Sequence, residues 1–256
     1  MKSILVTFSI AASLFSCQPK QINENVHVRN TMATIYIQQA PEYIALAEQA
    51  YYQARISLDN QLKTASNPLA VVLDIDETVL DNSPYQAKQI LENFNYPDYW
   101  DEWIEKEAAK PIPGALSFLQ HADSLGIVIF YISNRKHHLL TPTINNFKKY
   151  NIPQADSSHI LLRTTTSSKE DRRNSVLNQG FSIAVFVGDN LDDMKEDFET
   201  DNIVDRKQAV QDHLAYFGTK YIVLPNPTYG KWVQNRGFYD SKFNQDSLAA
   251  SYLKSF

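Results

Sequence analysis

Two carboxylates spaced two positions apart, Asp74 and Asp76, directly follow the apolar run 70–73. In an extended or tightly turning segment, residues two apart can point to the same side. Two carboxylates that converge on one phosphate repel it unless a cation is present, so the pair predicts a divalent metal, and oxygen ligands favour a hard ion such as Mg2+. Asp74 could then attack phosphorus, and Asp76 could protonate the leaving alcohol. Taken alone, the motif favours a solvated acidic turn, and its position directly after an apolar strand is what supports the catalytic interpretation.

A second group of polar residues, Ser133 and Asn134, follows the apolar run 127–132. A hydroxyl group and backbone N–H groups at the end of a strand can hold phosphate oxygens, and Arg135 could add positive charge. Lys169 opens a later helical pattern, where a lysine opposes the helix dipole. A cation that reaches both the phosphate and the nucleophilic carboxylate would explain this placement. A capped strand-to-helix turn and a solvated charged face are the alternatives.

A third acidic group begins at Gly188 and Asp189, after the apolar run 183–187. Gly188 permits a tight turn. Asp189 and Asp193 lie four residues apart and could face the same way on an opening helical turn. One of these carboxylates could bind the metal directly. The other could hydrogen-bond to the groups that bind the metal without touching the metal itself.

Short apolar runs predict the strands that must position these residues. Runs that are apolar on both faces are typical of buried strands in a parallel sheet. The expected strands are 70–73, 127–132, 160–162, 183–187 and 221–224, and the expected helices lie near 114–125, 139–150, 169–179 and 191–199. This alternation predicts an α/β fold with helices on both faces of a parallel sheet. Ligands bind at the carboxyl ends of such strands, which is where the polar groups lie.

Residues 83–110 interrupt the alternation and predict a small helical cap over the site. Three aromatic residues near the expected site mouth, Tyr85 and Trp100 in the cap and Tyr229 after the last strand, could stack on a nucleobase. The alternative is that the cap aromatics form the cap's own core.

The first residues have the features of a targeting segment. Residues 1–16 carry a lysine and a short apolar run, which fits a secretory signal and is too short to span a bilayer. The stretch resembles a bacterial lipoprotein signal, which would make Cys17, the only cysteine, a lipidated N-terminus. A plain signal peptide is the alternative. We expect a tether over 17–32, a helical segment over 33–68 and the catalytic core over 69–256.

Composition and charge exclude several other classes of protein. The 256 residues suffice for one sizeable core with a small cap. The net charge is −5 and no Lys/Arg-rich run is present, so nucleic acid is not an expected partner. Cysteine-nucleophile phosphatase chemistry would need a further cysteine near an arginine, and nucleotide triphosphatases of the Gly-x-x-x-x-Gly-Lys type need a motif that this chain lacks.

The order of the motifs resembles the haloacid-dehalogenase superfamily, and the strings 72–85, 130–135 and 187–193 resemble its class C nonspecific acid phosphatases, bacterial surface lipoproteins that include 5′-nucleotidases. The resemblance implies a Rossmann-like core, a nucleophile at Asp74 and an acid/base at Asp76. It implies that Mg2+ is held by Asp74, the Asp76 backbone carbonyl and Asp189, with Asp193 supporting the metal's waters. Ser133 and Lys169 would contact phosphate.

These observations predict an exported, metal-dependent acid phosphatase that hydrolyses phosphate monoesters, with nucleoside 5′-monophosphates as the expected substrates. The lipid on Cys17 would anchor it in the bacterial cell envelope, at the outer membrane. A homodimer is compatible with the sequence. The alternatives are a phosphotransferase on the same scaffold and a non-catalytic surface-binding lipoprotein.

Overall fold

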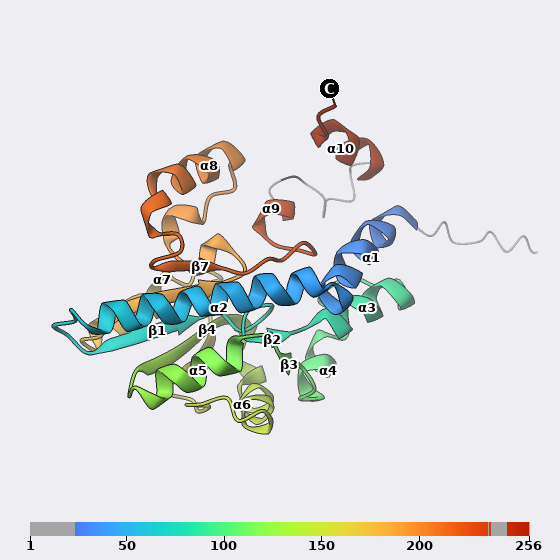
Figure 1. The fold of residues 1–256 in the computed structure, drawn as a ribbon. Coiled ribbons are helices and arrows are strands. Elements are labelled where there is room, and N and C mark those ends of the chain that lie inside the picture. The colour runs from blue at the N-terminus through green and yellow to red at the C-terminus, as the bar shows by residue number, and fades with distance from the viewer. Residues whose placement is uncertain (1–23, 235, 237–244, 256) are drawn as a thin grey trace, which may run out of the picture.

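The fold is built on one five-stranded parallel sheet (Figure 1). The computed structural model describes residues 24–234, 236 and 245–255. The strands are β1 (Leu69–Leu73), β4 (Val128–Lys136), β5 (Ile160–Arg163), β6 (Ser182–Gly188) and β7 (Tyr221–Val223). Their order is β5-β4-β1-β6-β7, and every neighbouring pair is parallel. The five predicted strands and the α/β class are therefore confirmed.

Side chains of the central strand point alternately into two separate cores, because successive residues of a strand face opposite sides of the sheet. Val71 and Leu73 belong to one core cluster, and Ala70 and Val72 to the other. All five residues of β1 are buried. A strand that is covered on both faces must be apolar throughout, which accounts for the continuous apolar run.

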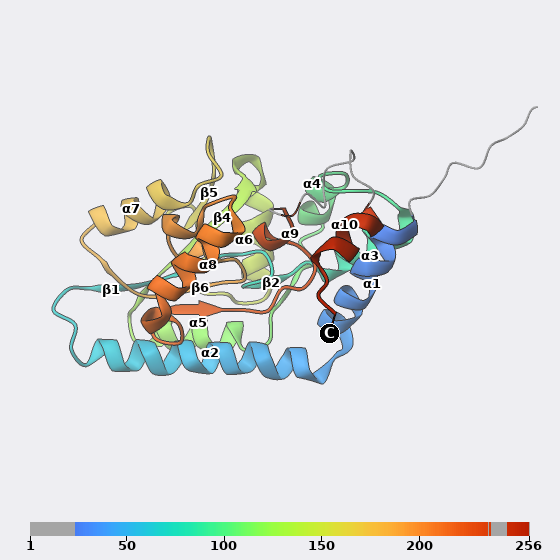
Figure 2. The ribbon, with the colours of Figure 1, turned by 90° about the horizontal axis from the view of Figure 1, so that it is seen from above.

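Helices cover both faces of the sheet, as predicted. On one face lie α2 (Pro41–Leu62), α5 (Ala115–Ser124) and α6 (Leu140–Lys149), and their buried side chains join the first core cluster. On the other face lie α7 (Glu170–Asn178) and α8 (Ile203–Asp212), whose buried side chains join the second. Figure 2 shows α2 along one side of the strands and α7 and α8 on the other.

The strand order places the functional residues together. The chain leaves β1 for β4 and β5 on one side and then crosses back to β6 and β7 on the other side. Such a reversal opens a crevice at the carboxyl ends of the central strands. Because β1 lies between β4 and β6, the loops that follow these three strands meet at one edge.

The insertion after β1 forms the expected helical cap. It contains α3 (Ser83–Glu92) and α4 (Trp100–Glu105), framed by the short antiparallel pair β2 (Leu80–Asp81) and β3 (Lys110–Pro111). The cap has a small core of its own, which also includes a residue from the start of the segment after β4. The members of that core are Tyr85, Trp100, Ile104 and Leu139.

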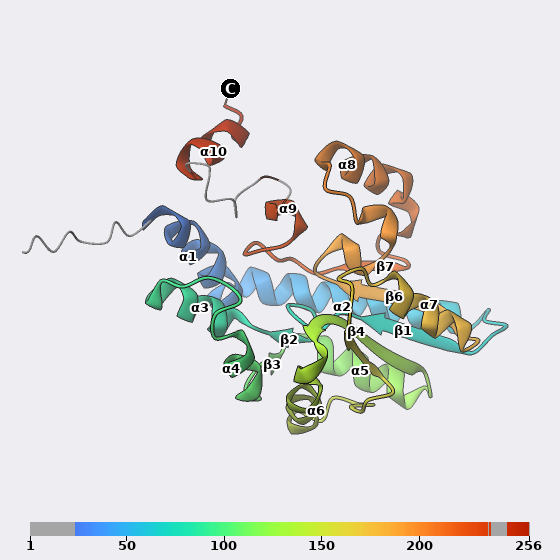
Figure 3. The same cartoon turned by 180° about the vertical axis from the view of Figure 1, so that it is seen from behind.

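The N-terminal helices differ from the predicted boundary. Helix α1 spans Glu24–Gln39, so residues 24–32, which we assigned to a tether, are helical. Helix α1 packs against α3 of the cap (Figure 3). That tertiary contact has no local sequence signal, which is why the polar composition suggested a tether. The expected signal segment and Cys17 lie outside the described residues. None of the described helices is both long and apolar enough to span a membrane.

The region after β6 also differs from the prediction of one helix over 191–199. It forms two 3-10 turns, η2 (Leu191–Asp193) and η3 (Glu196–Phe198), and the α-helix of this region is α8. Buried Phe198 and Met194 anchor these turns in the second core cluster. The remaining elements are η1 (His137–Leu139), η4 (Leu214–Tyr216), α9 (Lys231–Gln234) and α10 (Gln245–Tyr252).

Candidate active site

The expected nucleophile and the expected phosphate-binding lysine are in direct contact. Asp74 follows β1 and is 8% exposed, and Lys169 immediately precedes α7 and is 5% exposed. The Lys169 Nζ donates to Asp74 Oδ1 and also to Asp193 Oδ1, the latter at 2.7 Å. One buried ammonium group therefore joins the loops that follow β1 and β6.

The pKa values of this cluster indicate a shortage of positive charge. Burial raises the pKa of Asp74 to about 7, even though Lys169 acts to lower it. Burial alone would lower the pKa of Lys169, but the carboxylates of Asp193 and Asp74 raise it overall, so the lysine stays charged. The pKa values of both the carboxyl group and the ammonium group are therefore raised. This is expected where buried carboxylates outnumber the cations beside them.

Asp76, the expected acid/base, is held from three sides. Its Oδ1 accepts hydrogen bonds from Arg135 Nη2 at 2.7 Å, from Arg135 Nε at 3.0 Å and from Asn82 Nδ2 at 2.8 Å. Its Oδ2 has only longer contacts, at 3.3 Å each, to Ser133 Oγ and Arg135 Nε. The sequence suggested Arg135 only as added charge. The structure shows it buried and bound to Asp76 and to Thr143.

The loop that carries Asp74 and Asp76 is a tight turn. The Ile75 carbonyl accepts from the backbone N–H groups of Val79 and Leu80. The Thr78 hydroxyl accepts from the Asp189 N–H at 3.1 Å, and the Thr78 carbonyl accepts from the buried Tyr51 hydroxyl at 2.6 Å. Helix α2 and the β6 loop therefore both fix this turn.

Asp193 supports the site through both of its oxygens. Oδ1 accepts from Lys169, and Oδ2 accepts from the backbone N–H of Asn190 at 3.0 Å. Gly188 lies against this side chain, because a Cβ at position 188 would be 2.4 Å from Asp193 Oδ2. A residue whose oxygens are both engaged suits the predicted supporting role better than a role as a direct metal ligand.

The acidic residues form a plausible donor set for a hard divalent cation. Oxygens of Asp74, Asp189 and Asp193 lie within 4.8 Å of one another, the one group of this kind among the described residues. Burial, followed by the charges of Asp193 and Asp74, raises the pKa of Asp189 well above its usual range. A divalent cation would compensate both for the lost solvation of these carboxylates and for the repulsion between them, and it prefers carboxylate oxygens. The residues present therefore fit the predicted metal.

Asn134 and the loop around it have a different set of partners. The Asn134 side chain is exposed, and its oxygen accepts from Arg172 Nη2 at 2.7 Å. Arg172 also donates to the Ser133 carbonyl. The Asn134 side chain therefore contacts Arg172, which the sequence showed only as part of a charged run, and a phosphate contact of Asn134 stays a prediction.

The three aromatic residues predicted to stack on substrate lie in different surroundings. Tyr85 is 4% exposed, and its hydroxyl donates to the Asp98 carbonyl at 2.8 Å. It is therefore part of the cap's own core, which is the alternative that the sequence left open. The Trp100 ring lies 6.0 Å from the Arg135 guanidinium carbon, next to the group that holds Asp76. Tyr229 is partly exposed, and its hydroxyl donates to Glu77.

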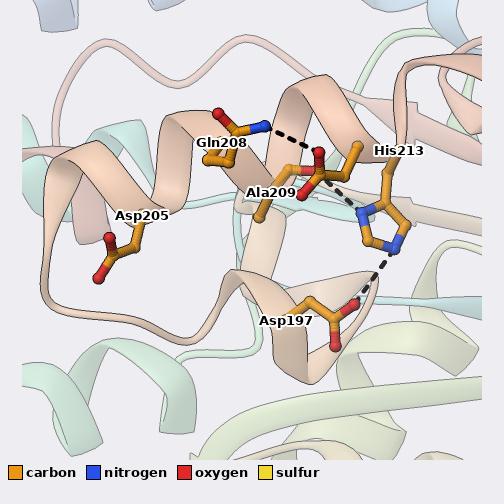
Figure 4. A pocket seen from close by; sticks show the side chains of 6 residues that line it. Asp197, Asp205, Gln208, Ala209 and His213 are labelled. Atoms are coloured by element: carbon orange, nitrogen blue, oxygen red, sulfur yellow. Dashed lines mark hydrogen bonds and ion pairs between the residues drawn. The ribbon is translucent and has the colours of Figure 1, made fainter.

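A separate pocket lies between η3 and α8 (Figure 4). It is lined by Asp197, Asp205, Gln208, Ala209, Asp212 and His213. His213 is engaged on both ring nitrogens, by the Ala209 carbonyl and by Asp197. None of the predicted catalytic residues lines this pocket, so we place the active site at the sheet edge instead.

Comparisons with known proteins match this geometry to one family. Residues 2–232 match the family model of the HAD superfamily, subfamily IIIB (acid phosphatase). The structure of the class C acid phosphatase from Bacillus anthracis is similar over 90% of this chain and 99% of that one, with 41% identity and a TM-score of 0.85. The same class of enzyme with tungstate bound matches with 40% identity, a TM-score of 0.84, and coverage of 91% and 99%.

Curated plant proteins match over a shorter region. Acid phosphatase 1 of Solanum lycopersicum is 30% identical over 132 residues, 48% of this chain and 51% of that protein. A stem 31 kDa glycoprotein of Glycine max is 32% identical over 133 residues, 49% of this chain and 52% of that protein. The chain spans about half the length of these curated relatives.

Asp189→Asn tests the fit of a metal to the carboxylate cluster. The substitution keeps the shape of the side chain and removes one buried charge, so we expect the metal-free variant to melt higher than the parent. A gain of 1 kcal/mol corresponds to about 2–4 °C. MgCl2 should raise the melting temperature of the parent and leave that of the variant unchanged. Asp205→Asn, on the exposed surface of α8, is the matched control.

The raised pKa values of Asp74 and Asp189 also predict how the folding stability of the metal-free parent depends on pH. In the unfolded chain the pKa of an aspartate is about 3.9, whereas in the folded protein the pKa values of Asp74 and Asp189 are raised. The folded state then binds more protons than the unfolded state, so metal-free stability should fall as pH rises from about 4 to about 7. The stabilisation by MgCl2 should be largest at the upper end. An equal MgCl2 response in Asp189→Asn would rule out this metal site.

Proposed function

Because this chain belongs to the acid phosphatases of HAD superfamily subfamily IIIB, we propose that it hydrolyses phosphate monoesters through an aspartyl-phosphate on Asp74. The observation that carries the proposal is the pairing of two differently held carboxylates. Asp74 is buried against Lys169, while Asp76, two residues further on, is held by Arg135 and Asn82. Two carboxylates in such different surroundings can take different roles.

The first step forms the covalent intermediate. An Asp74 carboxylate oxygen attacks phosphorus, the bond from phosphorus to the ester oxygen breaks, and Asp76 gives its proton to the departing alcohol. In the second step Asp76 takes a proton from water, the water oxygen attacks phosphorus, and the bond to Asp74 breaks. Inorganic phosphate leaves, and Asp76 is again protonated.

The contacts of Asp76 indicate which of its oxygens handles the proton. Oδ1 already accepts three short hydrogen bonds from Arg135 and Asn82, whereas Oδ2 has only contacts of 3.3 Å. We infer that Oδ2 carries the proton, since an oxygen with several strong donors has little remaining basicity. Lys169 would hold a phosphate oxygen beside Asp74, and Ser133 would contribute its hydroxyl group.

The metal that this family implies would be held by Asp74, the Asp76 carbonyl and Asp189, with Asp193 in support. A bound Mg2+ would offset the negative charge of the phosphate and of the carboxylates around it. The raised pKa values of Asp74 and Asp189 support this proposal, because they indicate carboxylates that lack a counter-charge.

We propose nucleoside 5′-monophosphates as the substrate class. Trp100 lies beside Arg135 at the site, and Tyr229 lies on the segment after β7. A flat aromatic surface near the phosphate site can stack on any nucleobase, which would give broad base specificity. Trp100 and Tyr85 both belong to the cap core, but only Trp100 also lies against Arg135, with 9% exposure. Tyr85 is 4% exposed and its hydroxyl group is bound within the cap, so it is not part of this proposal.

We also propose that the protein is exported and anchored by a lipid on Cys17 to a membrane of the bacterial cell envelope, the outer membrane. The proposal is supported by the signal-like residues 1–16 and the single cysteine that follows them. Helix α1 begins at Glu24, so only residues 18–23 would separate a lipidated Cys17 from that helix.

Asp74→Asn tests the nucleophile. The amide keeps the shape of the side chain but cannot attack phosphorus, so we expect turnover to fall by at least about a thousandfold while the melting temperature is retained. Asp76→Asn should also be severe, and more so for alcohols that leave poorly, because these need the proton most. The measurement is phosphate release with and without MgCl2. Near-normal turnover in Asp74→Asn would refute the mechanism, and phosphate transfer to added alcohols would identify a phosphotransferase.

Trp100→Ala tests the substrate class. Stacking is worth about 1–3 kcal/mol per base, so kcat/KM should fall about 5- to 150-fold for a nucleoside monophosphate. A phosphate ester that lacks a ring should be affected little, and Trp100→Phe should restore most of the nucleotide activity. An equal loss on both substrates would mean that Trp100 serves only the cap and Arg135.

Cys17→Ser tests the anchor. Without a thiol to carry lipid, the protein should leave the membrane fraction, and incorporation of labelled fatty acid should be lost, while activity in detergent extracts stays the same. Unchanged membrane fractionation with retained labelling would place the anchor elsewhere.

A further inference from the structure

Glu77, which follows Asp76, has a backbone conformation that is unfavourable for its residue type. Its φ is 56°, in the left-handed region that glycine adopts without strain. Other residue types are strained there, because their Cβ lies too close to the following carbonyl oxygen. A non-glycine residue in such a place invites a functional explanation, because a glycine would form the same turn without strain.

The Glu77 side chain is also buried, at 1% exposure. Its Oε1 accepts from the Asn82 N–H at 3.0 Å and from Gln86 Nε2 at 3.2 Å, and its Oε2 accepts from the Tyr229 hydroxyl. No ion pair with a described residue balances it. Burial of an acidic group without a counter-charge is unfavourable, so these three contacts must compensate for both burial and strain.

Tyr229 connects Glu77 to the turn that holds Asp189. In this turn Asn226 Oδ1 accepts from the N–H and the hydroxyl of Thr228, at 3.0 and 2.6 Å, and from the Tyr229 N–H at 3.4 Å. The other end of the Asn226 side chain, Nδ2, donates to Asp189 Oδ2 at 2.8 Å. A continuous path of hydrogen bonds therefore runs from Glu77 through Tyr229 and Asn226 to Asp189.

We propose that Glu77, Tyr229 and Asn226, the Glu77 clamp, form a positioning device that sets the affinity of the site for its divalent cation. The clamp fixes the peptide after Asp76 at one end and the Asp189 carboxylate at the other, so one network of three residues orients two of the expected metal ligands. This rests on the proposed metal-dependent function. It gives Tyr229 a role through its hydroxyl group that is separate from stacking by its ring.

The chemistry of the side chains supplies a matched set of variants. Tyr229→Phe keeps the ring and removes the donor. Glu77→Gly removes both the acceptor and the backbone strain. Glu77→Gln keeps the shape, since its oxygen can accept from the Asn82 N–H and its amide can donate to the Tyr229 oxygen. Tyr131→Phe is the control, because it also removes a part-buried tyrosine hydroxyl bond, here to the Pro153 carbonyl at 2.8 Å, and Tyr131 has no contact with the clamp residues.

The experiment is calorimetric titration of each metal-free protein with MgCl2, repeated with MnCl2, alongside kcat and KM at saturating metal. Partners that orient metal ligands are typically worth about 10- to 100-fold in metal affinity. We expect Tyr229→Phe to weaken metal binding by about tenfold, Glu77→Gly by at least as much, and Glu77→Gln and Tyr131→Phe to bind like the parent.

Two outcomes would overturn the clamp. One is a metal dissociation constant for Tyr229→Phe equal to that of the parent. The other is an equal loss of affinity in Tyr131→Phe, which would make the effect one of general stability. If the parent itself binds neither cation, the proposed metal-dependent function fails and the clamp fails with it. If the parent binds the metal and Tyr229→Phe binds it equally well, the clamp is refuted while the proposed metal-dependent function stands.

Discussion

An excess of buried and half-buried negative charge at one edge of the sheet is the constraint on which the rest of the site depends. Asp74, Asp76, Asp189 and Asp193 meet there, and the cations that contact them are Lys169 and Arg135. Carboxylates that are buried together repel one another unless cations or hydrogen-bond donors compensate. Burial, together with the charges of neighbouring carboxylates, raises the pKa values of Asp74 and Asp189. A site in this condition is prepared to bind a divalent cation and a phosphate together.

The scaffold tolerates this charge because rigid elements hold each carboxylate. Lys169 extends from the start of α7, Arg135 from the end of β4, and Asn226 from the segment after β7. Helix α2 contributes the Tyr51 hydroxyl to the turn between Asp76 and β2. Groups from elements on both faces of the sheet therefore converge on one edge, which only the reversal of strand order around β1 allows.

The sequence predicted the sheet, and the structure brings the residues proposed for catalysis together at one sheet edge, because both the strands and these residues have local signals. Continuous apolar runs identify buried parallel strands, and the aspartates stand directly after them. The partners of these aspartates could not be predicted. Arg135 holds Asp76 across 59 positions and Asn226 holds Asp189 across 37, and no local pattern specifies either pairing. Residues 24–32 were assigned to a tether because helix α1, to which they belong, packs against α3 of the cap. No local pattern specifies that contact either.

The central claim, a covalent phosphoryl group on Asp74, can be tested by trapping the intermediate. Enzyme that is turning over substrate would be denatured rapidly and treated with borohydride, which reduces an acyl phosphate to the alcohol, and then digested for mass spectrometry. The account predicts homoserine at position 74 in a substrate-dependent yield. Modification at another residue, or no modification in an enzyme that releases phosphate under the same conditions, would contradict it.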